Sequence, residues 1–157
     1  MCSEGVTDQN HLRGVQITDV DGKVRFTSIF PACCPGRWPH IHFEPCPARS
    51  SIADATTAIA TSQVVLPMNA CGAVHATAGW AARAADRARP ALTSDTVFGD
   101  DGGASRLGAI TGTVAEGRTV ALTAGVDTTT TPIGGARVGR SLLSNRCRDP
   151  QSDPQVL

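Results

Sequence analysis

Apolar and polar residues alternate in short segments over most of the first 126 residues, and this period of two is typical of half-buried β-strands. Gly, Pro, Asp and Ser residues bound the segments, as expected where the chain turns. We expect six strands, at residues 14–18, 23–30, 38–43, 63–66, 109–114 and 118–126. Many short alternating strands separated by turn residues predict an all-β fold, of the β-sandwich type.

Three further segments complete the expected connections. Residues 19–22, Asp-Val-Asp-Gly, predict a tight turn, because Asp accepts hydrogen bonds from nearby backbone and Gly tolerates positive φ. The Ala-rich segments 50–61 and 79–88 predict short connecting helices, with Pro67 and Pro90 as helix breakers beyond them. The strands on either side of the turn are expected to form a hairpin.

The chain of 157 residues is long enough for one ordinary hydrophobic core and too short for a second full domain. From Asp127 onwards the sequence is rich in Gly, Ser, Arg and Pro and has little periodicity. Such composition buries too little apolar surface to stay ordered. We therefore expect a β-sandwich domain over residues 1–127 and a disordered tail over residues 128–157.

Charge and hydropathy exclude several classes of partner. The formal net charge is zero and no run of like charges occurs, which argues against a nucleic-acid-binding protein. No apolar stretch approaches the roughly 20 residues needed to cross a bilayer, and the first residues lack the features of a signal peptide. The six cysteines lack the paired C-x-x-C spacing of a zinc ribbon, so the redox compartment stays undecided.

The sharpest candidate for chemistry is the triplet His40-Ile41-His42. On an extended strand, residues i and i+2 point to the same face, so the two imidazoles can share one metal ion. An isolated H-x-H triplet is weak evidence, and coincidental surface or core histidines are the alternative. Whether the two histidines form a metal site therefore depends on the residues around them.

Those residues form longer motifs in a fixed order: R-G at 13–14, T-D-x-D-G at 18–22, F-T-x-I-x-P at 26–31 and G-R-x-x-H-I-H-F at 36–43. This series closely resembles the signature of the intradiol ring-cleavage (catechol/protocatechuate-type) dioxygenases, in particular their small and often secreted branch. Residues 59–67 and 95–104 also resemble that branch, so the resemblance extends over residues 1–127.

The resemblance implies an oxidoreductase in which a non-haem Fe(III), held by two tyrosinates and two histidines, cleaves a small aromatic diol between its hydroxyls with O2. His40 and His42 match the histidine ligands. Arg37 matches an arginine that steadies negative charge near the substrate. Gln63 matches a polar residue that lies near the metal and orients reacting groups.

The two tyrosine ligands of the family fall at Cys2 and Cys34, and the chain contains no tyrosine at all. Tyrosinate is a hard oxygen donor suited to Fe(III), whereas cysteine is shorter and softer. The resemblance therefore implies impaired or absent ring cleavage. One alternative is a non-catalytic domain that binds a metal or an aromatic compound. Another is a tetrahedral Zn²⁺ site rewired from Cys2, Cys34 and the two histidines, and a third is a structural remnant without a ligand.

Other residues receive ordinary structural interpretations. Trp38 is expected in the core, with a wall for a flat substrate as the alternative. Histidines 11 and 75 are expected to be solvated, and cysteines 33, 46, 71 and 147 are expected to be ordinary thiols. Close relatives are expected to carry tyrosine at positions 11, 46 and 75. Relatives have a further N-terminal portion with strands of the sandwich. Without it, an uncovered sheet edge would lower stability and favour self-association.

Overall fold

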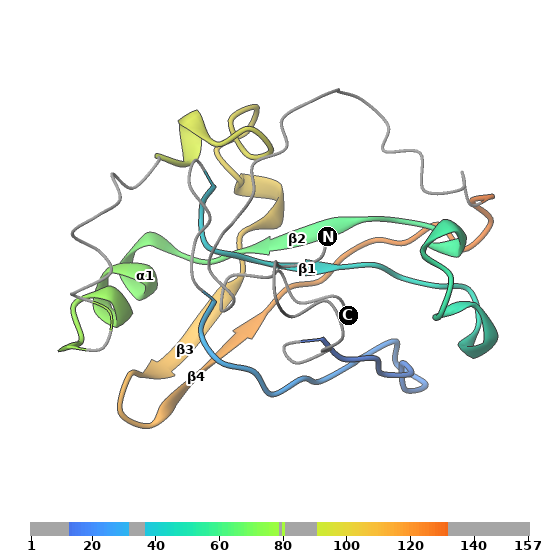
Figure 1. The fold of residues 1–157 in the computed structure, drawn as a ribbon, viewed down its shortest axis with the longest axis horizontal. Helices are drawn as coiled ribbons and strands as arrows, with labels where there is room; N and C mark the ends of the chain where they lie inside the picture. The colour runs from blue at the N-terminus through green and yellow to red at the C-terminus, as the bar shows by residue number, and fades with distance from the viewer. Residues whose placement is uncertain (1–12, 32–36, 79, 81–90, 132–157) are drawn as a thin grey trace, which may run out of the picture.

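The structure of the chain is a computed structural model that describes residues 13–31, 37–78, 80 and 91–131. In this part, strand β1 (His40–Phe43) pairs with β2 (Ser62–Val65), and β3 (Ala109–Thr113) pairs with β4 (Gly117–Ala121). Both pairs are antiparallel, and the two ribbons run in different directions (Figure 1). The described part is therefore β-rich, with two two-stranded sheets.

One backbone contact connects the two ribbons. Val65, at the end of β2, forms a parallel bridge with Leu107, and the N–H of Gly108 donates to the carbonyl oxygen of Val65 at 2.9 Å. A Cβ at position 108 would collide with the Val120 side chain and lie 2.9 Å from Cγ1 of Val64. Glycine is thus required where the start of the β3–β4 ribbon crosses close to β2.

Four of the six expected strands are confirmed, with shifted ends, and β4 ends at Ala121 rather than at residue 126. The expected strands at 14–18 and 23–30 are wrong, because these segments form no ladder. The turn between them is confirmed: the N–H of Gly22 donates to the carbonyl of Asp19 at 3.0 Å, and Gly22 has φ 73°.

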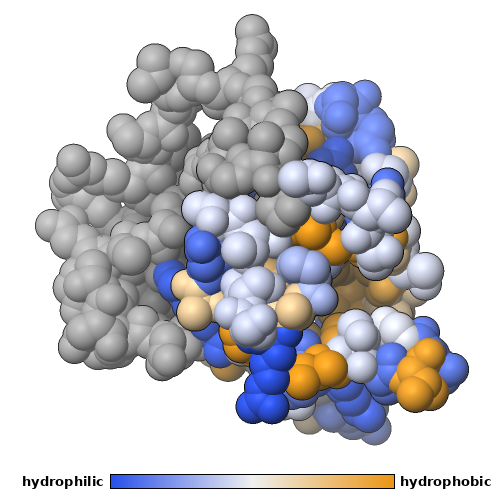
Figure 2. Space-filling model, turned by 90° about the vertical axis from the view of Figure 1, so that its right-hand side faces the viewer, coloured by the Kyte–Doolittle hydropathy of each residue, from blue (hydrophilic) through white to orange (hydrophobic). Residues whose placement is uncertain are grey.

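Several apolar side chains of the N-terminal described segment remain at the surface. They are Val15, Ile17, Val20, Val24 and Ile29. Figure 2 shows on one face of the molecule that hydrophobic surface lies in small areas between hydrophilic residues. Without a ladder to hold it, the segment presents its apolar positions singly rather than burying them as one face of a sheet.

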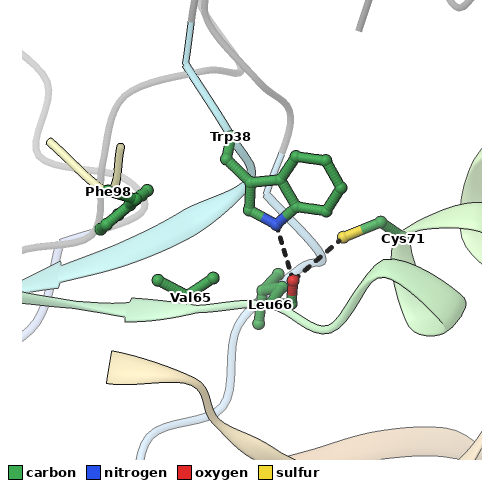
Figure 3. Packing of buried hydrophobic residues seen from close by; sticks show 5 residues of the cluster. All are labelled: Trp38, Val65, Leu66, Cys71 and Phe98. Carbon is green, nitrogen blue, oxygen red and sulfur yellow. Dashed lines mark hydrogen bonds between the residues drawn. The ribbon is translucent and has the colours of Figure 1, made fainter. Parts of the chain in front are cut away.

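The core lies beside the β1–β2 ribbon. Its buried members are Trp38, Val65, Leu66, Cys71 and Phe98 (Figure 3). The indole Nε1 of Trp38 donates to the carbonyl of Leu66 at 2.7 Å, so this buried polar group is satisfied. Trp38 is thus confirmed as a core residue, and Ile41 packs against the same cluster.

Helix α1 (Met68–His75) follows β2 directly and was not predicted. Pro67, which we expected to be a helix breaker, instead stands at the start of α1 with φ −60°, where its missing N–H costs nothing. The helix buries Ala70, Cys71 and Val74, and Cys71 belongs to the core cluster. In Figure 1, α1 lies beyond the end of β2, to the left of the β1–β2 ribbon.

The expectation of a solvated imidazole at position 75 is wrong. His75 is buried, and its ring packs against the rings of Phe30 and Trp80 at centroid distances of 6.2 and 5.2 Å. Its place at the end of α1, facing two aromatic side chains, explains the burial. The fold thus uses His75 as an aromatic packing residue.

The helix expected at 50–61 is wrong, because two 3-10 turns stand there instead, η1 (Arg49–Ser51) and η2 (Ala55–Thr57). The carboxylate of Asp54 accepts from the backbone N–H of Thr56 at 2.9 Å, and the hydroxyl of Thr57 donates to the carbonyl of Asp54 at 2.7 Å. Such local side-chain bonds compete with helical backbone bonds. Two more 3-10 turns, η3 (Leu92–Ser94) and η4 (Ala104–Arg106), precede β3.

Two predictions lie outside the described residues. The helix expected at 79–88 falls almost wholly on residues that the structure does not describe, as does the tail beyond residue 131.

Candidate functional site

The candidate site is built on β1, whose extended backbone brings His40 and His42 to one side of the ribbon. In the ladder with β2, His40 lies opposite Val65 and His42 lies opposite Gln63. The two histidines therefore have different neighbours, one apolar and one polar.

His40 is the buried histidine of the pair. Its Nδ1 lies 2.6 Å from the carbonyl oxygen of Trp38, and a carbonyl only accepts, so Nδ1 carries the hydrogen and Nε2 presents a lone pair. The ring packs edge-on against Phe98 at 5.6 Å. Burial lowers the pKa of His40 to about 4, an effect that the carbonyl of Trp38 partly opposes. His40 is thus neutral at pH 7, which is the form that binds metals.

His42 is held between two polar side chains. Its Nε2 lies 3.1 Å from Oε1 of Glu44, and its Nδ1 lies 3.4 Å from Nε2 of Gln63. The hydroxyl of Thr61 lies 3.4 Å from the same Glu44 oxygen. Both ring nitrogens of His42 therefore have partners, and a metal ion at Nε2 must take the place of the proton shared with Glu44.

Arg37 is fixed next to the histidines by a buried carboxylate. Its Nε lies 3.2 Å from Oδ2 of Asp95, which is 3% exposed, and the N–H of Trp38 donates to the same oxygen at 2.6 Å. The guanidinium also lies over the ring of Phe98, with Cζ 5.6 Å from the centroid. In the described part of the chain, Nη2 of Arg37 is buried and has no hydrogen-bond partner.

Asp95 remains charged despite its burial. Burial by itself raises the pKa of this carboxyl, but backbone N–H donors from Trp38 and Val97, at 2.6 and 2.7 Å, and the charge of Arg37 outweigh burial. The net result is a pKa below the usual value for aspartate. The charged carboxylate of Asp95 therefore holds Arg37 in place.

The structure brings together some of the predicted site residues. His42 contacts Gln63 directly, and Arg37 and His40 contact the same Phe98 ring. Cys2 and Cys34, expected at the positions of the tyrosine ligands, lie outside the described residues.

Sequence reasoning missed two acidic residues of the site, Asp95 and Glu44. Asp95 opens one of the segments that carry the family resemblance, yet its partner Arg37 lies 58 positions away in the sequence. Glu44 stands two residues after His42, so the alternation of an extended strand could have placed it on the same side.

A ferric centre of the kind implied by the resemblance does not fit the residues present. Within residues 13–31, 37–78, 80 and 91–131 no three His, Cys, Asp or Glu side chains are grouped so that they could hold a metal ion. The whole sequence contains no tyrosine to supply a phenolate. Fe(III) prefers hard anionic oxygen donors, and two imidazoles do not replace them.

Comparison of the chain with protein families, curated proteins and solved structures gives no match. Among the helices of the described residues, none has the length and apolar character needed to span a bilayer. The functional argument therefore rests on the residues of the site.

Proposed function

We propose that this chain is an intradiol dioxygenase-type oxidoreductase with a β-sandwich domain, in which ring cleavage is impaired. The ancestral reaction would be the O2-dependent cleavage of a catechol-type diol at a non-haem ferric site. The observation that carries the proposal is the tautomer of His40: its Nδ1–H donates to the Trp38 carbonyl at 2.6 Å, which leaves the lone pair of the neutral ring on Nε2. That histidine lies in the R-W-P-H-I-H segment that carries the resemblance.

The surroundings of the histidines support the same proposal. Arg37 provides a cation next to His40 that a buried carboxylate keeps in position, as expected for a residue that steadies an anionic substrate. Gln63 contacts the ring of His42, as expected for a residue that orients a metal ligand. The neutral state of His40 at pH 7 suits metal coordination.

Impairment follows from the missing phenolates. A thiol at position 2 or 34 is shorter than a tyrosine side chain and is a softer donor, so it neither reaches as far nor favours Fe(III). The proposed chemistry has lost its anionic oxygen ligands, while the imidazole pair and the arginine remain.

Restoring the tyrosines tests this proposal. The double variant Cys2→Tyr/Cys34→Tyr should bind about one Fe(III) per chain and absorb visible light through tyrosinate-to-Fe(III) charge transfer, whereas the original chain should do neither. Cys46→Tyr is the matched control, because it adds a tyrosine at a partly buried free thiol that is assigned no ligand role. Adding His40→Ala/His42→Ala to the double variant should remove the iron. If the double variant binds no iron, the proposal is wrong.

A second candidate is a non-catalytic metal-binding domain. It is favoured by the carboxylate of Glu44, which lies 3.1 Å from Nε2 of His42 and provides an anionic oxygen without tyrosine. The rewired Zn²⁺ site of Cys2, Cys34 and the two histidines is a different version of this candidate. Zinc retained by Cys2→Ser/Cys34→Ser would eliminate that version.

A further inference from the structure

We propose that His42 and Glu44 together form a binding site for a divalent first-row cation, with Zn²⁺ as the representative ion. Glu44 then supplies the negative charge for which this chain has no tyrosinate. The inference concerns the same site as the proposed function, but it rests on the contacts of these two side chains. Either proposal can therefore fail alone.

The spacing of the two donor atoms suits a shared ion. Nε2 of His42 and Oε1 of Glu44 are 3.1 Å apart. Two such ligands on a tetrahedral Zn²⁺, each about 2.1 Å from the metal, would be roughly 3.4 Å apart. To exchange the shared proton for a cation, the two donor atoms must move apart by only about 0.3 Å.

Gln63 can hold the His42 ring in both states. In the absence of metal, its amide NH2 lies 3.4 Å from Nδ1 of His42 and can donate to it. When Nε2 binds a cation, Nδ1 must carry the hydrogen, and a flip of the Gln63 amide presents an oxygen to accept it. A second partner that fixes the ring in this way is what metal-bound histidines commonly have.

The pair is open to solvent and lacks a competing cation. The His42 and Glu44 side chains are 19% and 25% exposed, so an ion can reach them and keep water as its remaining ligands. Among the described residues, Glu44 forms no ion pair with Lys or Arg, and the hydroxyl of Thr61 approaches the same carboxylate oxygen. His40 takes no part, because its ring is buried against Phe98.

The imidazole–carboxylate pair also selects the class of cation. Imidazole favours zinc and its first-row neighbours, whereas Mg²⁺ prefers oxygen ligands alone and gives up its water reluctantly. The site should therefore bind Zn²⁺ and discriminate against Mg²⁺.

Calorimetric titration of the full chain with ZnCl2 tests the site, after alkylation of accessible thiols so that they cannot compete for zinc. We expect one ion per chain and a loss of affinity of roughly tenfold or more in both Glu44→Gln and His42→Gln. Glu116→Gln is the matched control, because it makes the same chemical change at an exposed residue whose side chain contacts Thr113. It should leave the affinity unchanged, and MgCl2 should give no binding.

A second measurement locates the ion in the original chain. On addition of ZnCl2, the imidazole NMR signals of His42 should shift while those of His40 stay in place. Undiminished zinc affinity in Glu44→Gln, or a shift of the His40 signals, would overturn the site. If the original chain binds no zinc, this inference is wrong, while the iron test on the tyrosine-restored variant still decides the proposed function.

Discussion

The two β-ribbons differ in burial although both are short antiparallel pairs of similar alternating sequence. In β2, Val64 and Val65 are buried, and Val65 shares a core cluster with Phe98 and with Cys71 of α1. In β3 and β4 most residues are exposed, with Ile110, Arg118 and Val120 partly buried. The candidate site lies on the covered ribbon. The comparison teaches that alternation produces a strand, while the segments that cover the strand decide whether it can carry a buried site.

Truncation of core residues should give the largest contrast between the ribbons. Phe98→Ala removes a fully buried ring beside β1 and β2 and should lower the free energy of unfolding by about 4 kcal/mol. Ile110→Ala on β3 removes a partly buried side chain and should cost about 1 kcal/mol. Urea unfolding of both variants measures the difference. Equal costs would show that the two ribbons are equally important for the core.

Acidification should weaken the covered ribbon through His40. Its pKa is about 4 in the folded chain and 6.5 when unfolded, so the unfolded state takes up the proton first as the pH falls. The contribution of His40 to the free energy of unfolding is therefore largest above pH 6.5 and should decrease by about 3 kcal/mol between pH 7 and pH 4. Urea unfolding with a chelator present, across this range, measures the loss.

The variant His40→Asn separates this effect from the titration of carboxylates. Asparagine can still donate to the Trp38 carbonyl but does not titrate, so the loss between pH 7 and pH 4 should be much smaller. An unchanged pH dependence would mean that the site histidine is not buried as described.

Removing the negative charge of Asp95 should also lower the free energy of unfolding, but by less than acidification does. Asp95→Asn leaves Arg37 without its partner and turns amide hydrogens toward backbone N–H donors, at an expected cost of about 2 kcal/mol. Asp100→Asn is the matched control, because Asp100 pairs with Arg106 at an exposed position. If both variants unfold at the same urea concentration, Arg37 does not depend on Asp95 for its position.

Part of the site and four strands could be predicted from local sequence. The triplet at 40–42 lies on β1, and Gln63 lies on β2 opposite His42, as the alternating segments suggest. The helix predicted at 50–61 was wrong because Asp54 and Thr57 form local hydrogen bonds, and α1 was missed because Pro67 was interpreted as an end rather than a beginning. Propensity describes single segments and does not include the contacts that select between alternatives.

The sequence by itself determined the alternation of the four strands, the turn at Asp19–Gly22, the two histidines on one strand and the absence of tyrosine, because each of these depends on neighbouring residues or on composition. Only the tertiary structure decided that His40 is buried against Phe98, and it alone joined Arg37 to Asp95. The reason is physical: burial and charge pairing depend on segments that are distant in sequence, and these meet only when the chain folds.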